Sequence, residues 1–477
     1  MFNQLWRCKV KRLLRITGGL LSLLALAALA VALALTFGGL RRDVKPASQA
    51  FQSPIETPTQ PPYPMPATPT LPGLPATPTV APTPVPRCTF AARPAPAEPG
   101  PLLEAYRFSE PQVVLTHTSA IGIAGWLPDG QHLLITRDIP STNRNSIDVF
   151  NVRTAELRTY AEREGYNGKP VWLSALRAVV YATLVEDERH EQGIRFHPEL
   201  WISYGDPQQV ERLAPDLGGV SLAVEPDGKH LWYFFRSEPD RPQQLNVENR
   251  AVQPAPLDLA SLRYPKPGLE WAMRNRSPSF TTVWRPDGSQ MVLYSQFWTF
   301  LLDARTNQVC ELDLGEYNPE AMDIPPWAIE AQWSPNGRFL AFITTDSLNA
   351  LLRRTELTIL DTETGERRTL SPGPDIEPGR HYVTDMAWAP DSRYLAVLGV
   401  VRITEMGSEK AGLFIVDIEE GEFEQILSDH EFGGGLWASQ MAWGPSGSSL
   451  AVNCPTPEEG RLCIISVRPK NAQEEQP

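Results

Sequence analysis

One short motif recurs along this chain and limits what the chain can fold into. A Trp-x-Pro-Asp-Gly block, or a close variant, precedes a short apolar run, as in Trp284–Gly288 before MVLYS and Trp333–Gly337 before FLAFIT. In such a turn Pro presets φ, Asp hydrogen-bonds the turn backbone and Gly accepts the left-handed conformation. The motif therefore predicts a tight antiparallel hairpin wherever it occurs.

The motif occurs in seven copies, spaced roughly 45–60 residues apart, which is the spacing of propeller blades. The copies begin at Trp126, Trp172, Glu225, Trp284, Trp333, Trp388 and Trp443. A second hairpin follows, as in ELTILDTETGERRTL at Glu356–Leu370. A four-stranded meander of this size cannot bury both faces alone and needs neighbours of its own kind. We therefore predict an all-β, seven-bladed β-propeller of four-stranded antiparallel blades.

The repeated block, with its following Ile-x-x-x-Asp-x-x-x-Gly hairpin, resembles the TolB-like propeller repeat, a relative of WD repeats. The resemblance covers about residues 110–468. It departs at Trp172, where the Pro-Asp-Gly turn is missing, and at Glu225, where the Trp is missing. The resemblance implies a fold and not a function, because propellers host many unrelated functions.

The segment before the repeats has the pattern of a membrane anchor followed by a stalk. We expect a basic cytoplasmic tail at 1–15 and a transmembrane signal-anchor helix at 16–40, because Ile16–Phe37 is an uninterrupted apolar run. At 1.5 Å per residue this run reaches about 33 Å, enough to cross a bilayer core. The alternative is a cleaved signal peptide. Cys8 beside this helix is either acylated or a free thiol.

Residues 41–101 are rich in Pro and Thr, and we expect a disordered linker that serves as an extended stalk. Its Thr-Pro pairs leave open whether it is O-glycosylated or a bare spacer. The propeller should occupy 102–468, followed by a polar tail at 469–477. The last repeat lacks a fourth strand, and the apolar run at 112–116 should fill that place and close the ring.

The predicted propeller is acidic. The chain carries a net charge of −13, although residues 1–45 hold eight Lys or Arg against one Asp. The negative charge of the propeller argues against binding to nucleic acid and against docking on an anionic membrane surface. We therefore expect the protein to contact the membrane only through its N-terminal helix. We expect a monomeric propeller.

The cysteines leave two pairings open. Cys454 and Cys463 lie on predicted neighbouring strands and form either a cross-strand disulfide or two buried thiols. Cys88 could pair with Cys310 and tie the stalk to the propeller.

Motifs of known chemistry are absent from the sequence. There is no Gly-x-Ser-x-Gly elbow, P-loop, dinucleotide fingerprint, HExxH or CxxC, and the seven histidines lack metal-ligand spacing. We therefore predict no cofactor, no metal and no catalytic residue that spacing can reveal. The repeated Trp residues recur in register, which favours packing between blades over a binding cage.

Loop length is the most informative functional signal. The turns inside each hairpin are short, whereas the other connections, such as Val185–Glu199 and Leu314–Glu330, are long and irregular. Long loops on a rigid scaffold commonly carry binding sites, and Trp, Tyr and Arg dominate interface energetics. The candidate binding residues on this long-loop face are Tyr264, Trp271, Arg274, Tyr317, Trp327, His381, Tyr382 and Trp437. The alternative is that several of them fold back over the blade tips.

These observations favour a single-pass membrane protein with a cytoplasmic N-terminus and an extracytoplasmic propeller. We expect a non-catalytic binding or scaffold module for a protein, peptide or glycan of the cell envelope. The alternative is an envelope enzyme of the lyase or glycosidase type, with a site in the central channel where polar residues from different blades converge.

Overall fold

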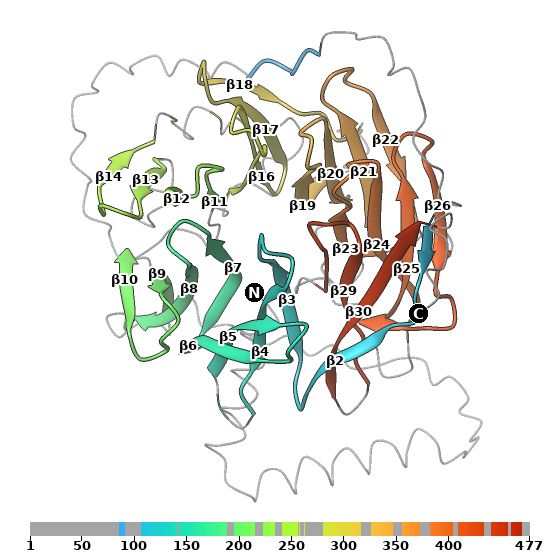
Figure 1. Cartoon of the computed structure of the whole chain (residues 1–477). Coiled ribbons are helices and arrows are strands. Elements are labelled where there is room, and N and C mark those ends of the chain that lie inside the picture. The colour runs from blue at the N-terminus through green and yellow to red at the C-terminus, as the bar shows by residue number, and fades with distance from the viewer. Residues whose placement is uncertain are drawn as a thin grey trace, which may run out of the picture. The chain divides into compact units, whose positions relative to one another are not determined.

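The described part of the chain is a ring of seven antiparallel sheets (Figure 1). The computed structural model describes residues 85–90 and 106–469, apart from residues 141, 143, 188–194, 215–222, 234–240, 256, 258–261, 263–279, 316–325, 347–354, 373–381, 404–408, 434–439 and 457–458. The expected membrane helix at 16–40 and most of the expected linker lie outside these residues. Where the structure is described, it contains no helix of the length and hydrophobicity that a membrane span requires.

Six blades are built from four strands that follow one another in sequence, with the first strand innermost (Figure 1). The strands, by blade, are β3 (Ile121–Trp126), β4 (His132–Asp138), β5 (Arg144–Asn151) and β6 (Leu157–Glu164) in blade 1; β7 (Tyr166–Leu173), β8 (Ala178–Asp187), β9 (Arg195–Ser203) and β10 (Val210–Ala214) in blade 2; β11 (Ala223–Val224), β12 (His230–Tyr233), β13 (Gln243–Asn246) and β14 (Val252–Pro254) in blade 3; β15 (Thr281–Trp284), β16 (Gln290–Ser295), β17 (Trp298–Asp303) and β18 (Gln308–Glu311) in blade 4; β19 (Trp327–Trp333), β20 (Phe339–Thr345), β21 (Glu356–Asp361) and β22 (Arg367–Leu370) in blade 5; and β23 (Val383–Trp388), β24 (Tyr394–Ile403), β25 (Glu409–Asp417) and β26 (Glu422–Ile426) in blade 6. A short strand, β27 (Phe432–Gly433), extends blade 6.

Blade 7 joins the two ends of the propeller. It contains β28 (Met441–Trp443), β29 (Ser449–Asn453) and β30 (Gly460–Pro469), and its outer strand is β2 (Gln112–His117), which pairs antiparallel with the first half of β30. The far end of β30 pairs with β1 (Tyr106–Phe108). The run at 112–116 therefore stands where the sequence analysis expected the closing strand.

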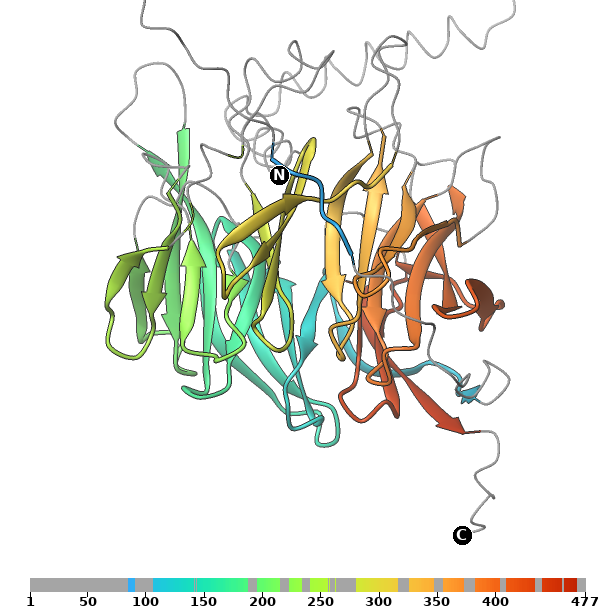
Figure 2. The ribbon, with the colours of Figure 1, turned by 90° about the horizontal axis from the view of Figure 1, so that it is seen from above.

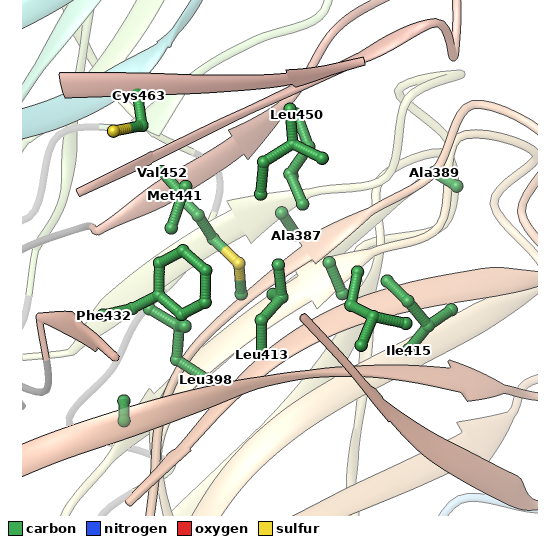
Figure 3. Close-up of a cluster of buried hydrophobic side chains, with 14 of the residues drawn as sticks. Ala387, Ala389, Leu398, Leu413, Ile415, Phe432, Met441, Leu450, Val452 and Cys463 are labelled. Carbon is green, nitrogen blue, oxygen red and sulfur yellow. The ribbon is translucent and has the colours of Figure 1, made fainter. Parts of the chain in front are cut away.

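The hydrophobic core is divided among the junctions between blades. Seven buried clusters are present, one at each junction between neighbouring blades, including the junction of blades 7 and 1. Figure 3 shows the cluster between blades 6 and 7, where Leu398, Leu413 and Ile415 face Met441, Leu450 and Val452. Seen from the side, the sheets stand next to one another around the ring (Figure 2). Each blade therefore buries its faces only because its neighbours cover them.

The motif residues act as the turn chemistry predicts. Gly130, Gly228 and Gly337 take positive φ values of 64°, 68° and 73°. Ser392 takes the same conformation at 65° without being glycine, and its hydroxyl accepts the backbone N–H of Asn336 in the preceding blade at 2.9 Å. The turn of blade 6, which has serine in place of glycine, therefore also makes a polar contact to blade 5.

Two disulfides are present among the described residues. Cys454 and Cys463 join β29's end to β30, with a Cα–Cα distance of 6.0 Å. Cys88 and Cys310 join the segment 85–90 to β18, with a Cα–Cα distance of 4.8 Å. The same segment forms a parallel bridge between Arg87 and Glu311, reinforced by two backbone hydrogen bonds of 3.0 and 2.9 Å. The C-terminal part of the expected linker is therefore fastened to the outer edge of blade 4 (Figure 1).

Two of the expected irregular loops are shorter than their sequences suggested. Part of Val185–Glu199 continues the β8–β9 hairpin, with Val185 opposite His197 and Asp187 opposite Arg195. The last residues of Leu314–Glu330 belong to β19, which begins at Trp327. These strand extensions have polar sequences, so they lack the apolar pattern that predicts a strand. They are held by hydrogen bonds between paired backbone groups, which do not require apolar side chains.

Deletion of residues 111–117 should unfold the whole propeller cooperatively, because it exposes the edge of β30 and opens the junction between blades 7 and 1. Thermal unfolding followed by circular dichroism checks this. The same measurement on a chain lacking 471–477 serves as the control and should show an unchanged melting temperature. An unchanged melting temperature for the 111–117 deletion would contradict the role of β2 in closing the ring.

Candidate functional site

The central channel carries a layer of polar residues at one repeated register. Three residues before the motif Trp of five blades stand, in chain order, Lys169, Thr281, Glu330, Asp385 and Gln440. In blade 1 the same position is the buried Ile123. All these positions lie on or directly before the innermost strands, which line the channel of a propeller (Figure 1). Five blades thus bring polar groups to one level of the channel.

Two bulges set the direction of the carboxylates in this layer. The pairing of β19 with β20 shifts between Ala328 and Glu330, and the pairing of β23 with β24 shifts between Val383 and Asp385. A bulge adds a residue on one strand and turns the side chains beside it. Because both bulges stand directly before a carboxylate in equivalent positions, the two blades present Glu330 and Asp385 in the same way.

Asp385 is buried and hydrogen-bonded to backbone. It is 2% exposed. One of its carboxylate oxygens accepts the N–H groups of Gln440 and Met441, at 2.5 and 2.9 Å, and the other accepts the N–H of Met386 at 2.9 Å. Asp385 therefore fastens the inner strand of blade 7 to blade 6. Burial, with the nearby charge of Glu330, raises its pKa to about 7, although Lys169 and these N–H groups pull in the opposite direction.

Glu330 is the carboxylate that lines the channel. Glu330 is half-buried. The amide of Gln332 donates to it at 2.8 Å and also to the carbonyl of Met386 at 2.8 Å. Burial raises the pKa of Glu330, while Lys169 across the channel opposes that rise. Burial and the charge of Glu330 together raise the pKa of the neighbouring Tyr294 phenol.

The network continues across the closure of the ring. The amide of Asn453 donates to the side chain of Gln440 at 2.9 Å and to the carbonyl of Ile121 at 2.6 Å. Polar contacts therefore link blades 5, 6, 7 and 1 around the channel. Chemically, the layer offers one cation, Lys169, which remains exposed, and one carboxyl, Glu330, whose pKa is raised by burial.

The residues predicted from loop length fall mostly outside the described residues. This applies to Tyr264, Trp271, Arg274, Tyr317, His381 and Trp437. Trp327 is the first residue of β19 and is half-buried. Tyr382, directly before β23, is 8% exposed, so its ring offers little surface to a partner. The structure brings neither of these two rings into the channel layer.

Sequence reasoning missed the channel layer, although a signal for it was present. Aligning the six copies that have the Trp shows a charged residue three positions before it in three blades, namely Lys169, Glu330 and Asp385. Charged residues are rarely buried unless they are paired or functional. The alignment of repeats, rather than a motif search, identifies this site.

One group of residues outside the channel has donor atoms close enough for a metal ion. The group is Glu225, Asp227 and His230, whose candidate ligand atoms lie within 4.8 Å of one another. These atoms already have protein partners: His230 contacts Asp227 at 2.5 Å, and Glu225 accepts the indole N–H of Trp232 at 2.6 Å. The same Asp–His contact recurs in the turn of blade 1. We therefore assign this group to the turn and not to a metal site.

Comparison with known proteins finds distant structural neighbours and leaves the function open. No protein-family model matches the chain, and no curated protein matches it in sequence. Similar solved structures include an oligogalacturonate lyase from Vibrio parahaemolyticus, with a TM-score of 0.48 and 11% identity over 76% of this chain and 97% of that one. An oligogalacturonate lyase in complex with manganese gives a TM-score of 0.47 and 11% identity, covering 76% of this chain and 98% of that one.

TolB from Acinetobacter baumannii is also among the similar structures, with a TM-score of 0.34 and 14% identity, covering 68% of this chain and 78% of that one. The seven-bladed β-propeller itself follows from the strand pairing of this chain. At these identities and scores the likenesses carry no activity, ligand or partner over to this chain.

The channel carboxyls should make stability fall with rising pH. The pKa of Asp385 rises from an ordinary 3.8 to about 7, and that of Glu330 rises too, so the folded state binds more protons than the unfolded state in this range. Their contribution to the free energy of unfolding therefore decreases between about pH 4 and pH 7. Glu330→Gln removes one charge and its repulsion, so the stability of the variant relative to wild type should increase across that range.

Urea unfolding of both proteins at several pH values measures this difference. Glu424→Gln, an exposed carboxylate on β26, is the matched control and should show a constant difference. A constant difference for Glu330→Gln as well would contradict the raised pKa values.

Proposed function

We propose that this protein is a non-catalytic binding or scaffold module, tethered to a membrane, that presents its propeller to a protein, peptide or glycan of the cell envelope. The observation that carries the proposal is the fastening of segment 85–90 to blade 4 by the Cys88–Cys310 disulfide and the bridge from Arg87 to Glu311. The disulfide and the bridge set the place where the preceding chain reaches the propeller, at the outer edge of blade 4. A tether that ends there leaves the two faces of the propeller open to a partner.

The two disulfides also support an extracytoplasmic location for the propeller. Disulfides form and persist in oxidising compartments and are rare in the cytosol. Together with the apolar run at Ile16–Phe37 and the Pro-rich segment after it, they are consistent with a single-pass protein whose N-terminus is cytoplasmic. We place the binding surface on the long-loop face, where Trp271, Tyr317, Trp327 and Trp437 are the proposed contacts.

Chemical crosslinking of the full chain in its native membrane, followed by mass spectrometry, tests this proposal. We expect a reproducible envelope partner crosslinked to 255–279 or 314–330, and at least a tenfold lower yield for Trp327→Ala, since interface aromatics commonly contribute 2 kcal/mol or more, by a rough estimate. Phe423→Ala is the matched control, because Phe423 is an exposed aromatic ring on β26, at the rim of blade 6. Equal yields for both variants, with both proteins folded, would place the contact elsewhere.

A second candidate function is an envelope enzyme of the lyase or glycosidase type, favoured by the channel layer. Glu330 with a raised pKa is suited to donate a proton, and Lys169 across the channel to stabilise developing negative charge. Asp385 is excluded from the same role, because both its oxygens hold backbone N–H groups.

If the channel is catalytic, the purified protein should cleave at least one glycan in a panel of acidic and neutral polysaccharides. Glu330→Gln should then lower kcat by about 100-fold or more, the usual contribution of a general acid. Glu424→Gln should leave kcat unchanged. Cleavage that persists in Glu330→Gln would remove the channel from consideration, and a partner found without any cleavage would favour the scaffold function.

A further inference from the structure

Blade 2 breaks the repeat at its first turn. Where other blades have Pro-Asp-Gly or a close variant that keeps the Pro, this blade has Leu-Ser-Ala-Leu-Arg after Trp172, and Arg177 takes a positive φ of 50°. The turn's backbone hydrogen bonds are long, at 3.3 Å from Leu176 to Leu173 and 3.4 Å from Arg177 to Ser174. A blade is expected to depart from the repeat pattern where a functional requirement outweighs the stability that the pattern provides.

The indole of Trp172 also lacks a hydrogen bond that three of its counterparts make. In three blades the motif Trp donates its N–H to a carbonyl on the inner strand of the preceding blade: Trp126 to Ala442 at 3.0 Å, Trp333 to Val283 at 3.2 Å and Trp388 to Gln332 at 3.2 Å. Trp443 instead donates within its own turn, to the carbonyl of Gly447 at 3.2 Å. Among the described residues, two motif indoles have no acceptor: the N–H of Trp284, which is buried, and the N–H of Trp172, which lines a groove.

The cause lies in blade 1. The inner strand that Trp172 faces, β3, is bulged between Ile123 and Gly125, and Gly125 has a φ of 149°. The regular alignment of carbonyls along that strand is therefore lost at this point. An indole N–H is a donor only, so it needs water or a ligand where no carbonyl is available.

A groove of about 380 Å³ opens at this place, between blades 1 and 2. This volume lies at the lower end of the range for small-ligand sites. Its wall includes the ring of Trp172, which packs edge-on against Tyr160 with centroids 5.7 Å apart. The groove lies on the face of the short turns, opposite to the long loops, so loop length could not reveal it.

The charged groups of the groove divide into occupied and available ones. Arg158 donates to the carbonyl of Gly205 at 3.2 and 3.1 Å, and Asp129 is paired with His132 at 2.7 Å. By contrast, within the described residues the side chains of Arg177 and Glu156 make no hydrogen bond or ion pair. The groove therefore presents a guanidinium and an indole N–H as available donors, with one carboxylate as an available acceptor.

We propose that this groove binds a small ligand through a carboxylate group. The guanidinium of Arg177 and the N–H of Trp172 donate to the carboxylate, since charge-assisted hydrogen bonds to carboxylates are the strongest that Arg forms. Glu156 accepts a hydroxyl or amide N–H elsewhere on the ligand, which selects for a polar substituent. The inference rests on the proposed binding function and adds a second surface to it. The carboxylate can belong to a sugar acid or to a peptide terminus.

Calorimetric titration of the purified full chain tests the proposal and separates the two sources. The probes are gluconate and N-acetylglycine, with sorbitol and N-acetylglycinamide as neutral counterparts, each up to about 10 mM, a range that detects millimolar binding. We expect at least one acid to bind and its neutral counterpart not to bind. Binding of gluconate alone indicates a sugar acid, and binding of N-acetylglycine alone indicates a peptide terminus.

Variants show whether the binding is in the groove. Trp172→Phe, which keeps a ring but removes the N–H, and Arg177→Ala should each weaken binding roughly tenfold, as the loss of a hydrogen bond to a charged group does. Arg153→Ala, an exposed arginine on the neighbouring turn that does not line the groove, is the matched control. No binding by either acid, equal binding by a neutral counterpart, or unchanged binding in both variants overturns the proposal. None of these results affects crosslinking on the long-loop face, so the two proposals fail separately.

Discussion

Burial between blades is the interaction on which the rest of this structure depends. A four-stranded sheet leaves two apolar faces, and each of the seven clusters is completed only by the next blade. The stability of any one blade therefore depends on the whole ring. The strand β2, which precedes the first repeat in sequence, is as important for stability as a strand within a blade. The same dependence leaves the inner strands little freedom to move, so groups placed on them are held firmly.

This rigidity explains how charged groups persist in the channel. Asp385 is almost fully buried, yet it accepts three backbone N–H groups, two of them from blade 7. A carboxylate satisfied in this way links blades where apolar contact alone would not fix the register. Glu330 occupies the same register without such bonds, so its protonation remains responsive to Lys169 and to the channel's contents. Equivalent positions have thus diverged into one structural and one available carboxyl.

Much of the fold could be predicted from the sequence because turn chemistry is local. Pro-Asp-Gly fixes a hairpin within five residues, and the repetition of Trp126, Trp284 and Trp333 at blade spacing predicts the ring. Pairings between distant residues have no local signal. Cys88 and Cys310 are separated by 222 residues, and the sequence left their disulfide undecided. The candidate binding residues were predicted from loop length and composition. These properties indicate where the chain is irregular, but they do not indicate which side chains lie close together.

The positions that could not be predicted are those where the repeat is broken or specialised. Trp172 stands at the same repeat position as the other motif Trp residues, and the bulge at Gly125 that accompanies the missing acceptor of its N–H lies in another blade. Lys169 and Glu330 likewise gain significance only when a bulge and a closed ring bring them to one level. In a repeat protein, most residues maintain the repeat, so a group that departs from its counterparts without a compensating contact identifies a site more reliably than any single motif. By that criterion the channel layer and the groove at Trp172 are candidate sites of the described propeller, in addition to the long-loop face proposed as its binding surface.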